Sequence, residues 1–279
     1  MGSVFLVLAA GWLFYLFGVD AFLEAAYTGE SWSYFNEYAA RWRVRQVDPT
    51  LDAFLAKARS LLLRYAVLGT AGVTLVSGLY ALRPKAFTSF FSTKTSPYNL
   101  ALFRIAIFGT LLAQDLESVP FFARLPESLQ FPPPGLSAVL PFVSTDPTFV
   151  FALKLVFWGA CICGILGLYT RVSAAIALLT GLYVMGIPQL YGKVNHYHHL
   201  LWFAALLVPS RCADVLSLDA VRTAGGRPRP STPEPDRAYA LPIRYTWLLL
   251  GILYFFPGFW KFVSEGMAWA FSENLKFYM

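Results

Sequence analysis

Charged residues are scarce in this chain, where Asp, Glu, Lys and Arg make up 14% of 279 residues. Soluble domains carry about 25%. In addition, 57% of the residues are hydrophobic and the mean hydropathy is +0.54. Together these values exclude an ordinary water-soluble domain. The net charge of +6 is small and lies mostly in polar loops. It therefore indicates membrane orientation and contact with lipid headgroups, and we expect no nucleic-acid partner.

Cysteine and histidine are also rare, with three of each. Cys161 and Cys163 lie inside an apolar run and Cys212 lies in a loop, which excludes a disulfide framework and favours small packing residues. All three histidines fall within residues 196–199. The first 20 residues have an apolar stretch but neither a positive leading region nor a clean cleavage site, so we expect a retained membrane segment.

Long apolar runs are what the chain has in abundance. A membrane-spanning helix needs about 20 apolar residues, and backbone groups in lipid must pair within the segment. The pattern therefore predicts an all-α integral membrane protein, a multi-span bundle of about seven transmembrane helices with interfacial helices. The predicted spans are residues 3–19, 60–82, 98–116, 147–168, 171–189, 195–210 and 243–260.

The connecting segments differ in character. In SWSYFNEYAARWRVR, residues 31–45, aromatic residues recur at helical spacing beside three arginines, which indicates a helix lying in the membrane interface or an aromatic belt around a loop. Residues 117–146 contain FPPPG, which cannot be helical. Residues 223–236 are a flexible polar linker.

The orientation is only slightly favoured by charge. With a cytoplasmic N-terminus, nine basic residues face the cytoplasm and eight face outward. The parity of seven spans places the 117–146 loop, the histidine cluster and the end of the last span together on one side. We expect this to be the outer side and the side of the functional site.

The histidine cluster offers two interpretations. His196 and His199 are three residues apart and share a helical face, as in some metal sites, but no carboxylate or cysteine lies within a few residues. We therefore expect no metal. Simple interfacial placement suits His198 well, whereas His196 follows Asn195 and begins an apolar span, so it is a candidate site residue.

The last span ends with a second candidate, in LYFFPGFWKFVSEGMAW. Pro257 and Gly258 loosen the helix just before Lys261, so that a freed turn can bend around a ligand. Lys261 either extends to the interface at a helix end or, partly desolvated, serves as a base. Arg104, two turns into the third span, is expected to face the bundle interior and to pair with Asp219 or with a lipid phosphate.

Four segments occur in an order that resembles a known family. They are LALFRIAIFGTLL, GLYTRVSAAIAL, NHYHHLLWFAALLVPSRCADVLSLDA and YFFPGFWKFVSEGMAWAFSENLK. Together they look like the horizontally transferred transmembrane (HTTM) domain, the membrane module shared with vitamin K-dependent gamma-carboxylase. The resemblance covers about residues 88–279 and implies a domain there, with residues 1–87 as an N-terminal membrane extension of two spans and an interfacial aromatic helix.

The resemblance implies roles for particular residues. Asn195 and His196 match an Asn-His pair, Ser217 and Asp219 match a Ser-x-Asp motif, and Lys261 falls on the lysine that acts as the base toward reduced vitamin K. The implied cofactor is reduced vitamin K or another quinol. In the last segment, the positions that match the family pattern are Tyr254, Phe255, Gly258 and Trp269. Trp260 stands where the family has a second lysine, which is a departure from its pattern.

Two functions follow from these residues. The first is carboxylase- or epoxidase-like chemistry, a lyase or oxygenase activity that depends on a quinol, with Lys261 as the base, oriented by His196 and Asn195. Pro257, Gly258, Trp260, Tyr254, Arg104 and Asp219 are then expected to bind the substrate or cofactor. The second is a non-enzymatic module that binds or transports a lipid or quinone, or a membrane subunit of a complex with a protein partner. Carboxylation of protein glutamate by this chain alone is not expected, because the family's large domain beyond the membrane has no counterpart here.

Overall fold

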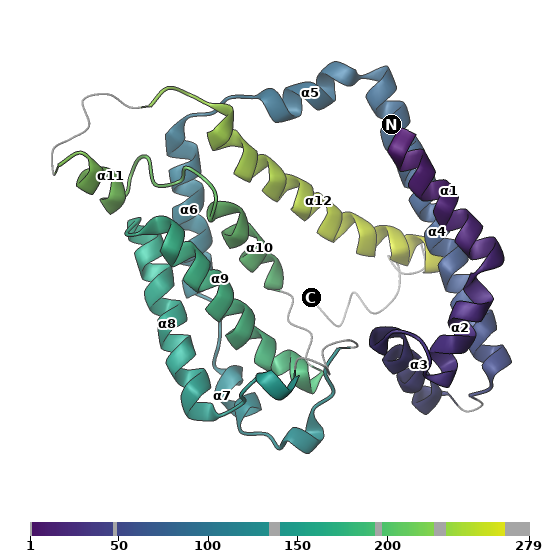
Figure 1. Cartoon of the computed structure of the whole chain (residues 1–279). Helices are drawn as coiled ribbons and strands as arrows, with labels where there is room; N and C mark the ends of the chain where they lie inside the picture. Colours follow the sequence, from purple (N-terminus) through teal and green to yellow (C-terminus); the bar gives the residue numbers. More distant parts are fainter. Residues whose placement is uncertain (1, 47–48, 134–139, 193–196, 226–232, 266–279) are drawn as a thin grey trace. The chain divides into compact units, whose positions relative to one another are not determined.

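Helices make up all the regular structure of the part of the chain that the computed structural model describes, residues 2–46, 49–133, 140–192, 197–225 and 233–265 (Figure 1). An isolated bridge between Thr95 and Asp236 is the one strand-like pairing recorded in these ranges. The prediction of an all-α fold is confirmed. The elements are α1 (Gly2–Phe17), α2 (Val19–Thr28), α3 (Ser33–Arg45), α4 (Leu51–Leu82), α5 (Pro84–Ser92), α6 (Pro97–Leu112), α7 (Ser118–Ala123), η1 (Glu127–Leu129), η2 (Leu140–Phe142), α8 (Pro147–Leu166), α9 (Thr170–Gly186), η3 (Ile187–Tyr191), α10 (His198–Leu207), α11 (Leu218–Thr223) and α12 (Arg237–Glu265).

Among the described residues, four helical segments are long and apolar enough to cross a membrane: α4, α8, α9 continued by η3, and α12. A fifth is possible by the same measure if α1 and α2, bent by 66° at their junction, form one span. Helices α6 and α10 are apolar but have 16 and 10 residues. At 1.5 Å per residue they reach about 24 and 15 Å, less than the ~30 Å of a bilayer core. The structure is thus compatible with a membrane-embedded protein, whereas seven spans stay a prediction.

The chain divides into two compact units. Unit 1 contains Met1–Phe87, Arg124–Thr145 and Pro188–Val194, and unit 2 contains Thr88–Ala123, Asp146–Ile187 and Asn195–Met279. The first break therefore falls after Phe87, but two later segments cluster with the N-terminal residues. The assignment of residues 88–279 to an HTTM domain stays a prediction.

In unit 1, α2 packs against both α3 and α4. The core between these helices contains Val19, Leu23, Ala39, Phe54 and Ala58. Helix α3 matches the aromatic, arginine-rich segment, so the helical interpretation of that segment is confirmed. Farther along, α1 meets α4, and the Trp12 indole donates a hydrogen bond to the Thr70 hydroxyl at 2.9 Å.

In unit 2, helices α6, α8, α9 and α10 pack side by side, and α12 lies against α6 and α10 (Figure 1). Glycines set the closest approaches. A Cβ on Gly164 would lie 2.7 Å from the ring of Phe108, and one on Gly181 would lie 2.6 Å from the Leu201 side chain. The helices can therefore approach each other only because these two positions have no side chain.

Local sequence signals explain where the helices of unit 2 begin. Ser96 precedes Pro97 and accepts a hydrogen bond from the amide of Tyr98, and Asp146 precedes Pro147 and accepts one from the amide of Phe149. Both are standard starts, because the side chain satisfies an orphan amide and proline fits the first helical position.

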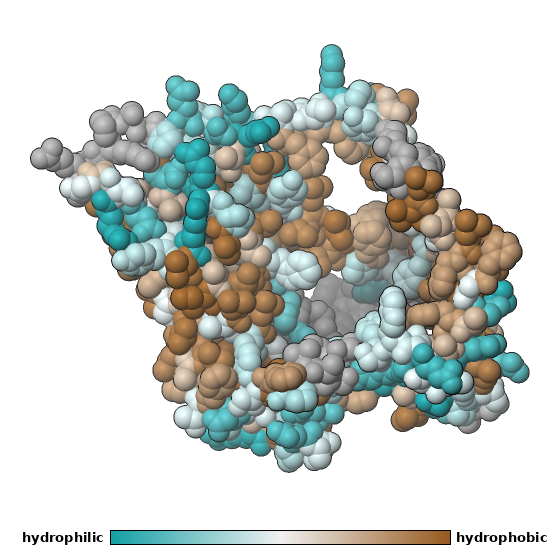
Figure 2. Space-filling model, viewed as in Figure 1, coloured by the Kyte–Doolittle hydropathy of each residue, from teal (hydrophilic) through white to brown (hydrophobic). Residues whose placement is uncertain are grey.

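The surface of unit 2 carries an apolar band. Figure 2 shows hydrophobic side chains over the middle of α8 and α9 and hydrophilic ones at the two ends of these helices. Large exposed apolar side chains on these helices include Phe151, Leu155, Ile162, Val172 and Leu179. Such a band between polar ends is the pattern expected of helices that face lipid.

Candidate functional site

A carboxylate from α11 holds the turn between α8 and α9. Helix α8 is capped at its C-terminus by Gly167, whose φ of +68° lies in the left-handed region, and Tyr169 before α9 supplies no side-chain cap. Asp219 supplies it instead. One of its oxygens accepts from the Tyr169 amide at 2.9 Å, and the other accepts from the amide and the hydroxyl of Thr170, both at 2.8 Å. These bonds fix α11 on the α8–α9 turn.

Arg104 ties three chain segments together beneath that turn. Its side chain is 0% exposed. One terminal nitrogen donates to the Cys212 carbonyl oxygen at 2.7 Å, and the other donates to the carbonyl oxygens of Leu216 at 2.5 Å and Ile165 at 3.3 Å. Ile165 lies in the last turn of α8, where carbonyls have no intrahelical partner. A planar, forked cation suits such a divergent set of acceptors.

The expected ion pair between Arg104 and Asp219 does not form. The expectation of an inward-facing Arg104 is correct, but its recorded hydrogen bonds all go to backbone oxygens, and Asp219 pairs with Arg222 at 3.4 Å. The reason is geometric. Asp219 is occupied by the amides at the start of α9, and the carbonyls of the 208–217 segment lie nearer to the guanidinium. Both residues of the Ser-x-Asp motif cap helices, since Ser217 caps α11 by accepting from the Ala220 amide at 2.9 Å and Asp219 caps α9. A role of Asp219 in binding a substrate or cofactor stays a prediction.

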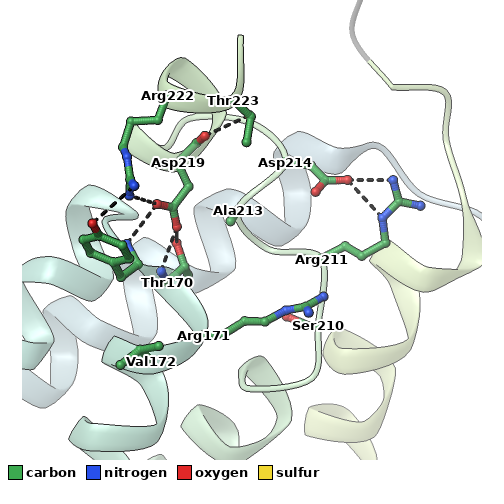
Figure 3. Close-up of a pocket in the computed structure, with 11 residues that line it drawn as sticks. Thr170, Arg171, Val172, Ser210, Arg211, Ala213, Asp214, Asp219, Arg222 and Thr223 are labelled. Atoms are coloured by element: carbon green, nitrogen blue, oxygen red, sulfur yellow. Dashed lines mark hydrogen bonds and ion pairs between the residues drawn. The ribbon is translucent and has the colours of Figure 1, made fainter. Parts of the chain in front are cut away.

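A pocket of about 540 Å³ adjoins this cluster, between the start of α9, the segment after α10, and α11 (Figure 3). We call it the arginine pocket, because Arg171, Arg211 and Arg222 all line it. Asp214 and Asp219 are its acidic lining residues. Arg211 bonds Asp214 at 2.7 Å, and the same carboxylate oxygen accepts from the Tyr239 hydroxyl at 2.7 Å. The start of α12 is thereby linked to the pocket.

The pocket favours ionised side chains. Burial acts to raise the pKa of Asp219, but hydrogen bonds from Thr170 and Tyr169 and the charge of Arg222 outweigh it and hold that pKa below its ordinary value. The hydrogen bond and charge of Asp214 raise the pKa of Arg211. Asp219 and Arg211 are therefore charged at neutral pH, and both carboxylates of the pocket already have cationic or amide partners.

The candidates of the last span lie far along α12 from the arginine pocket. Lys261 is 24 residues beyond the first residue of α12, which is about 36 Å of helix at 1.5 Å per residue. Tyr254, Gly258 and Lys261 are exposed, and Trp260 is half-buried. Pro257 lies inside the helix. The predicted site residues thus form two groups, with Arg104 and Asp219 at one end and the Pro257–Lys261 group toward the other end of α12.

The Asn195–His196 pair lies outside the described residues, so its predicted part in orienting Lys261 stays a prediction. The neighbouring histidines belong to the start of α10. A ring nitrogen of His198 lies 3.4 Å from the Met185 carbonyl oxygen, and the His199 ring contacts Phe203. Within the described ranges, no group of three His, Cys, Asp or Glu side chains is arranged to hold a metal ion.

One further cation lies inside unit 2. Lys154 of α8 is 8% exposed. Its ammonium donates to the Leu116 carbonyl oxygen at 3.3 Å and lies 4.7 Å from the centroid of the Trp158 ring. The carbonyl oxygen of Leu116, in the segment after α6, and the aromatic face of Trp158 thus give this lysine partners within the bundle.

Comparison with protein-family models, curated proteins and solved structures found no match to this chain. The resemblance to the HTTM family therefore rests on the quoted segments alone. The structure adds that three of those segments, which carry Arg104, Thr170 and Asp219, meet at one place in unit 2.

Sequence reasoning missed the arginine pocket. It treated Arg171, Arg211 and Arg222 only as loop charges that orient the protein. The available signal was their position: Arg171 and Arg211 border apolar runs, in the TRV and SRC tripeptides, and Arg222 follows Asp219 by three residues. The parity of the helices places all three at one end of the bundle, but only the fold shows that they border one pocket.

Proposed function

We propose that this chain is a multi-pass membrane protein that binds a quinol or a related isoprenoid lipid along the second half of α12, close to Lys261. The observation that carries the proposal is the exposure of that half-helix: every residue from 251 to 258 is exposed. Tyr254, Phe255 and Phe256 are 73%, 61% and 59% exposed. So much contiguous aromatic surface calls for a lipid-like or protein partner.

The shape of this surface suits a flat ring with a long apolar tail. Gly251, Tyr254, Gly258 and Lys261 recur at helical spacing and share one face. A Cβ built on either glycine would meet nothing within 4 Å, so a ligand can approach the backbone there. An isoprenoid chain that lies along this strip ends next to the ammonium of Lys261.

Pro257 adds a polar contact. Proline has no amide hydrogen, so the carbonyl of Leu253, four residues earlier, loses its usual helical donor. A quinol hydroxyl is a donor of the kind that this carbonyl lacks. Lys261, one turn beyond Pro257, then lies within reach of the same headgroup, either as a charge that anchors it or as a base that removes its proton.

The catalytic form of the proposal follows from the family resemblance. With reduced vitamin K or another quinol bound, Lys261 in its neutral form would accept the hydroxyl proton. Dissolved dioxygen would then be the oxidant that converts the quinol anion to the quinone or epoxide, in carboxylase- or epoxidase-like chemistry. In the binding form, the same lysine stays charged and only holds the headgroup. The proposal also includes that the N-terminus lies in the cytoplasm and that the site lies on the outer side of the membrane.

The decisive experiment uses the purified chain in nanodiscs with reduced vitamin K and a short-chain analogue. Binding is followed by quenching of tryptophan fluorescence, and turnover by formation of the quinone or epoxide. The variants are Lys261→Ala and Lys261→Arg, with Lys57→Ala as the control at another exposed lysine. Arginine keeps the charge but does not deprotonate in proteins.

Turnover that survives in the control and is lost in both Lys261 variants supports the catalytic form. Saturable binding without turnover, weakened by Lys261→Ala and kept by Lys261→Arg, supports the binding form. If the wild-type chain shows no saturable binding, the proposal is wrong, and the exposed half of α12 is then a contact surface for bulk lipid or a membrane partner.

A further inference from the structure

The arginine pocket lies at the opposite end of α12 from Lys261 and is not used by the function proposed above. It is built from three elements of unit 2, the α8–α9 turn, the segment after α10, and α11 (Figure 3). Two sets of hydrogen bonds hold these elements in place: the Thr170 amide at the start of α9 donates to Asp219, and Arg104 donates to the 208–217 segment. The pocket is therefore a fixed feature of the bundle.

Its charges leave one cation available. Arg211 is bonded to Asp214, and Arg222 is bonded to Asp219 and to the Tyr169 hydroxyl at 3.2 Å. Arg171 is exposed and makes no recorded hydrogen bond or ion pair with any described residue. Figure 3 shows its side chain extending across the pocket toward Ser210. Three guanidinium groups thus face two carboxylates, and the excess positive charge belongs to Arg171.

The surroundings of Arg171 are half polar and half apolar. Hydroxyl groups of Ser210, Thr170 and Thr223 belong to the pocket lining, whereas Val172, the next residue along α9, lines it and is 57% exposed. The pocket lies where the apolar band of unit 2 ends (Figure 2). A ligand that matches both halves has an anionic head beside the guanidinium and an apolar tail that runs down the outside of α9.

We propose that the arginine pocket binds the phosphate group of an anionic glycerophospholipid, with Arg171 as its main contact. Arginine matches a phosphate because two parallel N–H donors meet two oxygens. The acyl chains then lie against the apolar band beside Val172. Lipid binding here rests on the same placement of α8 and α9 in a membrane as the proposed function, but it involves neither Lys261 nor a quinol.

The test measures binding of dihexanoyl phosphatidylglycerol, a short-chain lipid, to the purified full chain in a neutral detergent. Dihexanoyl phosphatidylcholine is the zwitterionic comparison, and inorganic phosphate and glycerol 3-phosphate are the comparisons without acyl chains. We expect Arg171→Gln to weaken phosphatidylglycerol binding by about tenfold, the loss of one charge-assisted bidentate contact. The matched control is Arg237→Gln, which removes an exposed arginine at the start of α12 that does not line the pocket. It should change the dissociation constant less than about twofold.

Three results would overturn the proposal. Equal binding of the two lipids would show that the anionic headgroup is not recognised. Equal loss in Arg171→Gln and Arg237→Gln would show that only the overall charge matters. Binding of inorganic phosphate as tight as that of phosphatidylglycerol would make the pocket a phosphate site rather than a lipid site. Lys261→Ala serves as the separating control, because phosphatidylglycerol binding should stay unchanged in it even if quinol binding fails.

Discussion

Replacing Arg104 with methionine tests whether the hydrogen bonds of Arg104 hold unit 2 together. Methionine retains the apolar stem and much of the volume but removes all donors. The carbonyl oxygens of Cys212, Leu216 and Ile165 then lose their side-chain partner at once. Because these oxygens lie on two separate segments, the change also disconnects the 208–217 segment from α8.

The expected loss of stability follows from how deeply each of these carbonyl groups is buried. Cys212 is 1% exposed, and leaving its oxygen unpaired costs about 2 kcal/mol. Leu216 is 50% exposed, so water can replace part of the lost bond there, and together with Ile165 it adds roughly 1–2 kcal/mol. Relief of the buried charge offsets some of this sum. We therefore expect a net loss of about 3 kcal/mol in the free energy of unfolding.

Thermal unfolding of the purified protein in detergent measures this loss. For a chain of this size, about 3 kcal/mol corresponds to a drop in Tm of roughly 6–12 °C. Arg104→Lys should fall between wild type and Arg104→Met, because one ammonium group cannot reach three diverging oxygens. Arg237→Met is the control at an exposed position. A Tm for Arg104→Met within ~2 °C of the control would refute the structural role assigned to Arg104.

Two other predictions concern the same turn. Asp219→Asn should lower stability at neutral pH by about 1–2 kcal/mol through the weakened cap of α9. Because the folded-state pKa of Asp219 is depressed, this contribution is present above its unfolded pKa of about 4 and is lost as the pH falls through the folded pKa. A Tm difference between variant and wild type that is flat from pH 5 to 7 and narrows below about pH 4 is the expected result of a pH series. Gly167→Ala should destabilise by more than about 2 kcal/mol, since the residue has a left-handed φ and its Cβ would lie 2.3 Å from that of Ser217. Gly159→Ala, where a Cβ meets nothing within 4 Å, should be neutral by the same thermal assay.

The helices could be predicted from the sequence because their signals are local. Long apolar runs and the prolines and capping residues before them mark α4, α6, α8 and α12 without knowledge of any partner. The number of spans is a different matter. It depends on where each run begins and ends: α10, for example, extends over His198–Leu207 rather than the whole of the predicted run 195–210.

The site was harder to predict because its interactions join residues far apart in the chain. Arg104 and Cys212 are 108 positions apart, and Thr170 and Asp219 are 49 apart. An arginine within an apolar helix indicates that it has hydrogen-bonding partners. Backbone carbonyl oxygens occur at every residue, so the sequence does not indicate which of them bind it. The sequence therefore suggested Asp219, a carboxylate on the same side, or a lipid phosphate as the partner of Arg104. In the structure, Asp219 instead accepts hydrogen bonds from the start of α9.

This assignment changes what the resemblance to the HTTM family can mean for the chain. Three of the four quoted segments contribute to one cluster, in which Arg104 and Asp219 hold helix ends together. Residues that hold helix ends together maintain a fold, and a fold does not by itself imply a function. The proposed chemistry therefore depends on Lys261 in the fourth segment and on the Asn195–His196 pair. The hydrogen bonds of Arg104 and Asp219 explain packing in unit 2, so the proposed activity has to be tested at Lys261 and cannot be argued from the number of segments that resemble the family.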